Sequence, residues 1–305
     1  MKNKKILARK SILDLSPYIP GKPIEDVKRE LGLSEVIKLA SNETSVGPSP
    51  LAVEAIKKEV ENINLYPEGS SRLLREKIAH KLKINKEMII IGNGADDVID
   101  LIGMAFINEG DEVITGETTF PAYKIAVKIM GGKLTTVKLK DFRFDLDEIL
   151  QRINKKTKII FLDNPNNPTG TIIAKEEVSA FMKKVPQDVI VVFDEAYYHY
   201  VEDKNYPDSL SYILEGRNVI VIRTFSKIAG IAGVRVGYAI AKKDLIGYLR
   251  RVVNPFTANR LAQVAALASL DDEKHYKKVL KSNHEGKKYL YKELKKLGLS
   301  YVPTE

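Results

Sequence analysis

The 305-residue chain has no cysteine, which excludes disulfide bonds and thiolate metal ligands. It has only four histidines, and their spacing is not typical of metal ligands, so we predict no metal site. No apolar run approaches the length of a membrane span, and the basic start leads into no apolar stretch of signal-peptide length. These absences predict a cytoplasmic protein with no membrane partner. The histidines are His80, His199, His275 and His284.

The charge balance is basic, with a formal net charge of +9. The lysines are spread along amphipathic patterns with acids between them, and no arginine cluster is interleaved with aromatic residues. This distribution argues against a nucleic-acid partner and favours a surface that attracts anionic metabolites. The hydrophobic fraction of 44% and charged fraction of 29% are ordinary for a globular protein, and the length suffices for one large and one smaller domain.

Five short apolar runs rich in β-branched residues end abruptly in polar residues, and helical patterns separate them. Such alternation indicates an α/β fold with a mainly parallel sheet covered by helices on both faces. Ligands of such sheets collect at the carboxyl ends of the strands. Five polar strand ends therefore predict one shared site. The runs cover residues 88–91, 111–115, 158–162, 189–193 and 219–222.

The predicted organisation has three parts. We expect residues 1–44 to form an N-terminal arm that contributes to a small domain, residues 45–255 a large domain, and residues 256–305 the start of a C-terminal small domain. A strand pattern opens at residues 299–302, but the chain stops at Glu305 before a partner strand, so we expect this small domain to be truncated. Helices are predicted over residues 49–60, 71–83, 98–106, 259–270 and 273–297.

Lys227 is the candidate nucleophile. It follows a hydroxyl at Ser226 and precedes the small-residue stretch 228–233, which leaves a lysine little water and lowers its pKa. A desolvated lysine can form a Schiff base, although most lysines are simply solvated. Thr224 and Ser226 together with Arg235 predict an anion cradle, in which the guanidinium makes a forked, charge-assisted contact.

Two glycine- or proline-containing turns also follow predicted strands. Residues 92–97 contain two glycines and open a helix, where close backbone approach and free N–H groups suit a phosphate. Asp96 in this turn fits a helix cap equally well. Asn167 lies between prolines, and most such turns have no function beyond the turn itself.

Asp194 directly follows five apolar residues, so we expect it at a strand tip and partly desolvated. A carboxylate in that position needs a cationic partner or hydrogen bonds. A structural ion pair with Arg223 or Arg235 is the alternative to a functional role.

Seven motifs occur in order along nearly the whole chain. They are residues 16–23 (SPYIPGKP), 38–43 (KLASNE), 66–69 (YPEG), 164–170 (NPNNPTG), 194–197 (DEAY), 223–227 (RTFSK) and 233–238 (GVRVGY). In this combination the chain resembles the fold-type I pyridoxal-phosphate (PLP) aminotransferases. The first two motifs make it most similar to the histidinol-phosphate aminotransferase branch of that class.

The resemblance implies PLP as cofactor and a role for each residue near its ring. Lys227 would hold the cofactor covalently and move a proton between it and the substrate Cα. Asp194 would pair with the ring nitrogen and keep it protonated. Asn167 and Tyr197 would hydrogen-bond the 3′-oxygen, and Phe120 would stack on the ring.

The resemblance also implies a phosphate site, a partner subunit and a substrate side. Residues 45–255 would be the PLP-binding domain. Tyr66 would reach the phosphate in the neighbouring subunit, which implies a homodimer, and Asn42 and Tyr18 would lie beside the substrate. The phosphate would be held by Gly94, Ala95, Asp96, Thr224, Ser226 and Arg235.

The reaction implied by the branch converts histidinol phosphate and 2-oxoglutarate to imidazole-acetol phosphate and glutamate, in histidine biosynthesis. Aromatic or other amino acids are alternative amino donors, and a lyase resembling threonine-phosphate decarboxylase is a third possibility. A non-catalytic fragment is a fourth, because such aminotransferases carry a carboxylate-binding arginine near the C-terminus and this chain has no arginine after Arg260.

Overall fold

The computed structural model describes residues 7–17, 19 and 21–305. Its centre is a seven-stranded sheet in the order β1-β7-β6-β5-β4-β2-β3, in which only β7 runs antiparallel to its neighbours. The predicted mainly parallel α/β sheet is confirmed. The strands are β1 (Ile89–Gly92), β2 (Glu112–Gly116), β3 (Lys133–Val137), β4 (Thr157–Asp163), β5 (Ile190–Asp194), β6 (Val219–Thr224) and β7 (Gly237–Ala241).

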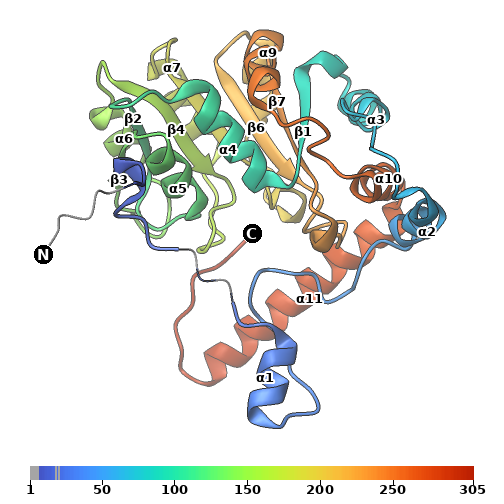
Figure 1. Ribbon diagram of the computed structural model, residues 1–305. Coiled ribbons are helices and arrows are strands. Elements are labelled where there is room, and N and C mark those ends of the chain that lie inside the picture. The colour runs from blue at the N-terminus through green and yellow to red at the C-terminus, as the bar shows by residue number, and fades with distance from the viewer. Residues whose placement is uncertain (1–6, 18, 20) are drawn as a thin grey trace, which may run out of the picture.

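Helices cover both faces of this sheet, as Figure 1 shows. Side chains alternate along each strand, so Ile160 and Leu162 of β4 join one apolar core while Ile159 and Phe161 join the other. The first core lies under α2, α3, α6, α7, α8 and α10, and the second under α4, α5 and α9. The helices are α1 (Ile24–Leu31), α2 (Pro50–Glu59), α3 (Arg72–Leu82), α4 (Ala95–Phe106), α5 (Ala122–Ile129), α6 (Leu146–Arg152), α7 (Lys175–Lys184), α8 (Ser209–Leu214), α9 (Lys243–Val252), α10 (Arg260–Ser269) and α11 (Glu273–Lys296).

The C-terminal helices differ in their relation to the sheet. α10 packs on α2, whereas α11 runs away from the sheet layers toward the end of the molecule where α1 also lies (Figure 1). Asp272 joins the two regions: its carboxylate accepts hydrogen bonds from the Ser49 hydroxyl at 2.6 Å and from the His275 N–H at 3.1 Å. No helix in the described part of the chain is both long and apolar enough to cross a membrane. The predicted domain boundaries stay predictions.

The five strands predicted for the sheet and the five predicted helices are confirmed to within a few residues. The helix predicted to begin at residue 98 begins earlier, at Ala95, because Gly94 supplies its N-cap. The strand predicted at residues 299–302 is wrong. This segment is irregular, and the ring of Tyr301 stacks on Tyr291 of α11 with 4.5 Å between ring centres. A strand forms only where another strand can share its hydrogen bonds, and the sheet lies elsewhere.

Candidate active site

Lys227 lies three residues beyond the end of β6, in a loop that the N-terminal segment covers. Its Nζ donates a hydrogen bond to the carbonyl oxygen of Ser41 at 2.9 Å and lies 5.6 Å from the centre of the Tyr197 ring. The N–H of Ser49 donates to the carbonyl of Ala229 at 2.9 Å, which holds the segment against the loop. Burial lowers the pKa of Lys227, as predicted. An amine in this environment is more nucleophilic near neutral pH than a solvated lysine.

Asp194 is the last residue of β5 and is only 4% exposed. Its Oδ2 accepts a hydrogen bond from the Tyr123 hydroxyl at 2.8 Å, and its Oδ1 accepts one from the N–H of Ala196 at 3.0 Å. Burial nevertheless raises the pKa of Asp194 to about 6. The carboxylate is therefore fixed in position but is not fully compensated for its loss of water.

The alternative of a structural ion pair at Asp194 is wrong. Arg223 pairs with Glu195 at 2.8 Å, and Arg235 pairs with Asp96 at 3.2 Å. None of the ion pairs among the described residues includes Asp194. Both arginines named in that alternative thus have other carboxylate partners.

The turn between β1 and α4 forms one side of an anion cradle. Gly94 has φ +93°, a conformation that favours glycine. A Cβ at Gly94 would lie 2.3 Å from Nη2 of Arg235, so the guanidinium and the start of α4 approach closely only because this residue is glycine. The N–H groups at the start of the helix, beginning with Ala95, together with this guanidinium, suit a phosphate.

Hydroxyl groups form the other side of the cradle. Oγ1 of Thr224 accepts a hydrogen bond from the N–H of Ser226 at 3.1 Å, and Nη1 of Arg235 lies 3.5 Å from the Ser226 Oγ. Asp96 lies in the first turn of α4 and pairs with Arg235, so the helix-cap role considered for it is wrong. The structure brings Thr224, Ser226 and Arg235 together, and their binding of an anion stays a prediction.

These groups line one cavity of about 610 Å³, together with other predicted site residues. The Asn42 amide donates to the Tyr197 hydroxyl at 2.9 Å, and burial raises the pKa of Tyr197. The ring of Phe120 meets the ring of Tyr123 edge to face, with 5.9 Å between ring centres. The predicted residues on this cavity are Asn42, Ala95, Asp96, Phe120, Asn167, Asp194, Tyr197, Thr224, Ser226, Lys227 and Arg235.

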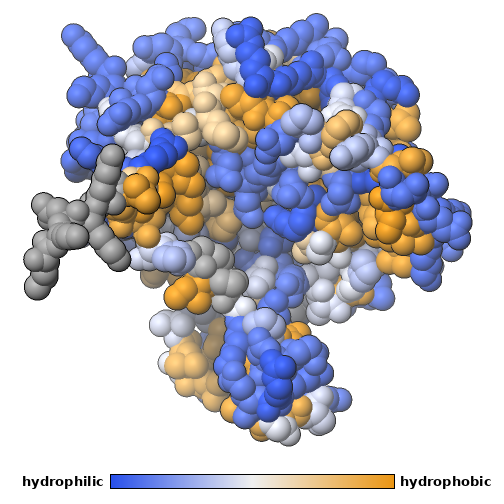
Figure 2. All heavy atoms as spheres, in the orientation of Figure 1, coloured by the Kyte–Doolittle hydropathy of each residue, from blue (hydrophilic) through white to orange (hydrophobic). Residues whose placement is uncertain are grey.

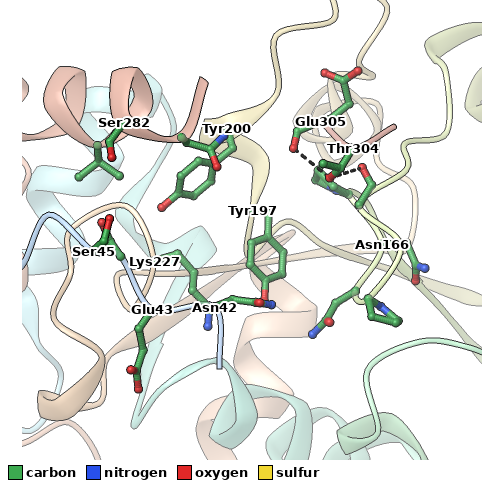
Figure 3. Close-up of a pocket in the computed structure, with 17 residues that line it drawn as sticks. Asn42, Glu43, Ser45, Asn166, Tyr197, Tyr200, Lys227, Ser282, Thr304 and Glu305 are labelled. Carbon is green, nitrogen blue, oxygen red and sulfur yellow. Dashed lines mark hydrogen bonds between the residues drawn. The ribbon is translucent and has the colours of Figure 1, made fainter. Parts of the chain in front are cut away.

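A second compartment adjoins this cavity on the other side of Lys227 and Tyr197. Figure 3 shows Tyr200, Ser45 and Ser282 around it, and Asn42 lines both compartments. Its lining includes hydroxyl and amide groups, which suit a polar ligand. Tyr18, predicted beside the substrate, lies outside the described residues.

Tyr66 is the predicted site residue that lies apart from the cavity. It is 79% exposed, and its ring stacks on Phe256 with 4.7 Å between ring centres. Nη2 of Arg260 donates to the Tyr66 carbonyl at 2.9 Å, which fixes the backbone here. Within one chain the structure does not bring this hydroxyl to Lys227.

The sequence interpretation missed two buried groups of the cavity, Tyr123 and Asp163. Asp163 ends β4, just as Asp194 ends β5, and the two are paired in the parallel register. The sequence could have identified Asp163, because it directly follows a predicted apolar run as Asp194 does. Tyr123 gave no comparable signal, since nothing in a helical pattern distinguishes a buried tyrosine that has a polar partner.

The class of protein follows from comparison of this chain with known families. The profile of the family "Aminotransferase class I and II" matches residues 34–305. The chain belongs to this family, and its sheet and helices have the fold of the type I PLP-dependent aminotransferases.

Comparison with individual relatives indicates one branch of this family. The chain is 50% identical to the histidinol-phosphate aminotransferase of Moorella thermoacetica, over 97% of this chain and 77% of that protein. It is 46% identical to the enzyme of the same name from Caldicellulosiruptor saccharolyticus, over 97% of this chain and 83% of that protein. Its structure is similar to that of histidinol-phosphate aminotransferase from Sinorhizobium meliloti in complex with pyridoxal-5′-phosphate, with a TM-score of 0.90, 28% identity, and coverage of 99% of this chain and 81% of that chain.

Proposed function

We propose that this chain is a PLP-dependent aminotransferase that converts histidinol phosphate and 2-oxoglutarate to imidazole-acetol phosphate and glutamate. The observation that carries the proposal is the cavity itself. A half-buried lysine with a lowered pKa, a buried carboxylate and an anion cradle surround one space. The names of the relatives at 45 to 50% identity support the substrate.

The residues of the cavity fit PLP in both charge and shape. The ring nitrogen of the cofactor is cationic when protonated, and Asp194 is a buried acid that pairs with no cation among the described residues. The cofactor phosphate is anionic and matches the start of α4 and Arg235, where a side chain at Gly94 would close the space. When bound, PLP supplies an electron sink for the carbanion formed at the substrate Cα.

Lys227 has two roles in this proposal. Its Nζ would hold the cofactor covalently, and a lowered pKa favours this role because the neutral amine is the nucleophile. With PLP bound, this Nζ would also carry a proton between the substrate Cα and the cofactor. The small-residue loop beyond Lys227 keeps water away from this amine.

The remaining residues hold the cofactor in place. Asp194 would keep a proton on the ring nitrogen, while Asn167 and Tyr197 would bind the ring oxygen and Phe120 would cover one face of the ring. Asn42, through its hydrogen bond to Tyr197, lies beside the substrate, as we also propose for Tyr18. The phosphate is held by Gly94, Ala95, Asp96, Thr224, Ser226 and Arg235, all within the large PLP-binding domain of residues 45–255.

The proposal includes a homodimer in which Tyr66 binds the phosphate in the partner subunit's site. Tyr66 is exposed, and it lies beside the exposed apolar side chains of Ile63, Leu65 and Phe256. Figure 2 shows apolar atoms gathered near α2 and α10, one of several apolar areas on this face. Exposed apolar patches of this kind mark contact surfaces. We also propose a cytoplasmic location.

Two measurements test the proposal. The purified chain reconstituted with PLP should show visible absorption from covalently bound cofactor, and a colourless protein would refute PLP dependence. Histidinol phosphate, and then phenylalanine as control, is mixed with the loaded protein under single-turnover conditions. Conversion of the cofactor to its amine form by histidinol phosphate but not by phenylalanine supports the substrate, and the reverse result contradicts it. Sedimentation velocity checks the dimer.

A further inference from the structure

Asp163 is a buried carboxylate of the cavity to which the proposed function gives no role. It is 3% exposed, ends β4 and lies beside Asp194 in the parallel register. One of its oxygens accepts a hydrogen bond from the Thr119 hydroxyl, and the other accepts one from the N–H of Asn167 at 2.8 Å. The carboxylate thus joins two loops that follow different strands, β2 and β4.

Both loops carry residues that we assign to the cofactor. In the first loop, Thr119 immediately precedes Phe120, which is assigned to the cofactor ring. In the second loop, Asn167 both donates to Asp163 and is itself assigned to the cofactor. The two loops share one further link, a hydrogen bond of 3.3 Å from Nδ2 of Asn166 to the carbonyl of Thr118. The stacking ring and the amide are therefore positioned relative to each other mainly through Asp163.

Asp163 places a second buried carboxylate beside that of Asp194. A neutral residue at position 163 would avoid this unfavourable burial of charge. Burial raises the pKa of Asp163 to about 7, and the charge of Asp194 contributes to this rise. Among the residues that the structure describes, no ion pair includes Asp163 or Asp194. A carboxylate buried without a cation is unfavourable unless a ligand supplies one, and both of these face the same cavity.

We propose that Asp163 is a positioning residue for the cofactor. It holds Phe120 and Asn167 in the geometry that binds the ring, and it adds negative charge next to Asp194. This inference rests on the proposed binding of PLP.

Four variants separate its two contributions. Asp163→Asn removes the charge but preserves both hydrogen bonds, because the amide can accept from Asn167 and donate to the hydroxyl oxygen of Thr119. Asp163→Ala removes the charge and both hydrogen bonds. Thr119→Val removes only the hydroxyl of one partner, and Thr119→Ser restores it. Asp145→Ala is the matched control, since that carboxylate accepts a backbone N–H at 3.0 Å at the start of α6, outside the cavity.

The measurements are the dissociation constant for PLP, the visible circular dichroism per bound cofactor, and the melting temperature of the cofactor-free protein. Asp163→Ala should weaken PLP binding about 10-fold or more, since an unsatisfied buried hydrogen bond changes affinity by that order. The circular dichroism should fall by about half, because the ring is no longer held in one orientation. Thr119→Val should show smaller changes in the same direction, and Thr119→Ser should reverse them.

The expected order of PLP affinity is parent, Asp163→Asn, then Asp163→Ala, with Asp145→Ala equal to the parent. Equal affinity and equal circular dichroism in the parent and Asp163→Ala would overturn this inference and leave the proposed function intact. A parent protein that binds no PLP would overturn both. If Asp163→Ala does not fold, Thr119→Val decides: unchanged affinity and circular dichroism in that variant refute the positioning role.

Discussion

At the carboxyl ends of β5 and β6, the charged residues on one side are paired with each other, whereas those on the side of the cavity are not. On one side, Glu195 and Arg223 form an ion pair at 2.8 Å, both are nearly inaccessible to solvent, and the guanidinium also lies 3.8 Å from the centre of the Tyr198 ring. On the other side, neither Asp194 nor Lys227 takes part in any ion pair among the described residues. Adjacent residues in the sequence thus have opposite electrostatic surroundings.

This difference separates groups that serve the fold from groups that serve a ligand. The Glu195 and Arg223 charges neutralise each other, so they need nothing from outside. Asp194 and Lys227 have shifted pKa values that burial causes, and a cofactor with a cationic ring nitrogen and an aldehyde would relieve both. The cavity side is poorly compensated as long as the ligand is not bound.

The largest expected effect is on the cavity side, in Lys227→Ala. The variant should lose the visible absorption of covalently bound cofactor and at least about 10³-fold in single-turnover rate, because it loses both the nucleophile and the proton carrier. The cofactor-free protein should keep its melting temperature, since no carboxylate in the described part of the chain pairs with this amine. Absorption spectra and differential scanning calorimetry check both expectations, with exposed Lys204→Ala as control. Retained turnover would remove Lys227 from the mechanism.

Glu195→Gln should have the next largest effect, now on stability. The change leaves the buried charge of Arg223 without a partner, which destabilises by about 3–5 kcal/mol. Urea unfolding of the cofactor-free protein measures the loss. Glu202→Gln is the matched control, because the pair of Glu202 with His284 is exposed and should contribute less than about 1 kcal/mol. Equal losses in the two variants would contradict the structural role of the buried pair.

Asp194→Asn should stabilise the cofactor-free protein, whereas Glu195→Gln should destabilise it. Folding raises the pKa of Asp194 from 3.8 to about 6, so the folded state prefers the protonated acid. The favourable contribution of protonated Asp194 to the free energy of unfolding is complete below pH 4. It disappears as pH rises through about 6. At pH 7 the cofactor-free variant should therefore be more stable than the parent, on the order of 2 kcal/mol. The difference should vanish at pH 4.

The same substitution should harm function while it helps the fold. Without a carboxylate at position 194 the ring nitrogen loses its proton, and the single-turnover rate should fall about 10²-fold or more. Urea unfolding at several pH values and stopped-flow absorption measure the two effects. An Asp194→Asn variant that is less stable at pH 7 would place Asp194 with Glu195, among the residues that serve the fold.

The smallest expected effect concerns the exposed Tyr66. Tyr66→Phe keeps the ring that stacks on Phe256 and removes only the hydroxyl proposed to bind the partner subunit's phosphate. The dissociation constant for PLP should rise about 5- to 10-fold, with no change in melting temperature or sedimentation. Tyr248→Phe, also at an exposed position, is the control. An unchanged dissociation constant would mean that the partner subunit contributes no hydroxyl.

The sequence was sufficient to predict the helices and strands that have a clear hydrophobic pattern. Continuous β-branched runs indicated five of the buried strands. β3 (Lys133–Val137) was missed because it lies at the sheet edge, is largely unburied and includes a lysine and two threonines. β7 (Gly237–Ala241) was missed because its small residues form no β-branched run. α1 (Ile24–Leu31) was missed because the prolines and glycines around it indicated an irregular arm.

The same reasoning explains which site residues were found. Lys227 and Asp194 were recognisable because each interrupts or follows an apolar run with a charge, an arrangement that burial makes unfavourable unless it serves a purpose. Tyr123 contacts Asp194 from α5, 71 residues away in the chain, and no local pattern encodes that contact. The link from Asp163 to Thr119 is likewise a meeting of two loops.

The order of residues was therefore enough to predict five strands of the sheet and the charged groups at their ends, because hydrophobic periodicity and strand ends are local properties. Only the folded chain decided which of those charges neutralise each other and which remain for a ligand. That outcome depends on distances of a few ångströms between segments remote in sequence: Arg223 points toward Glu195, Arg235 points toward Asp96, and Asp194 meets a hydroxyl. Coulomb energy and desolvation act through space, so they could be assigned only after packing was known.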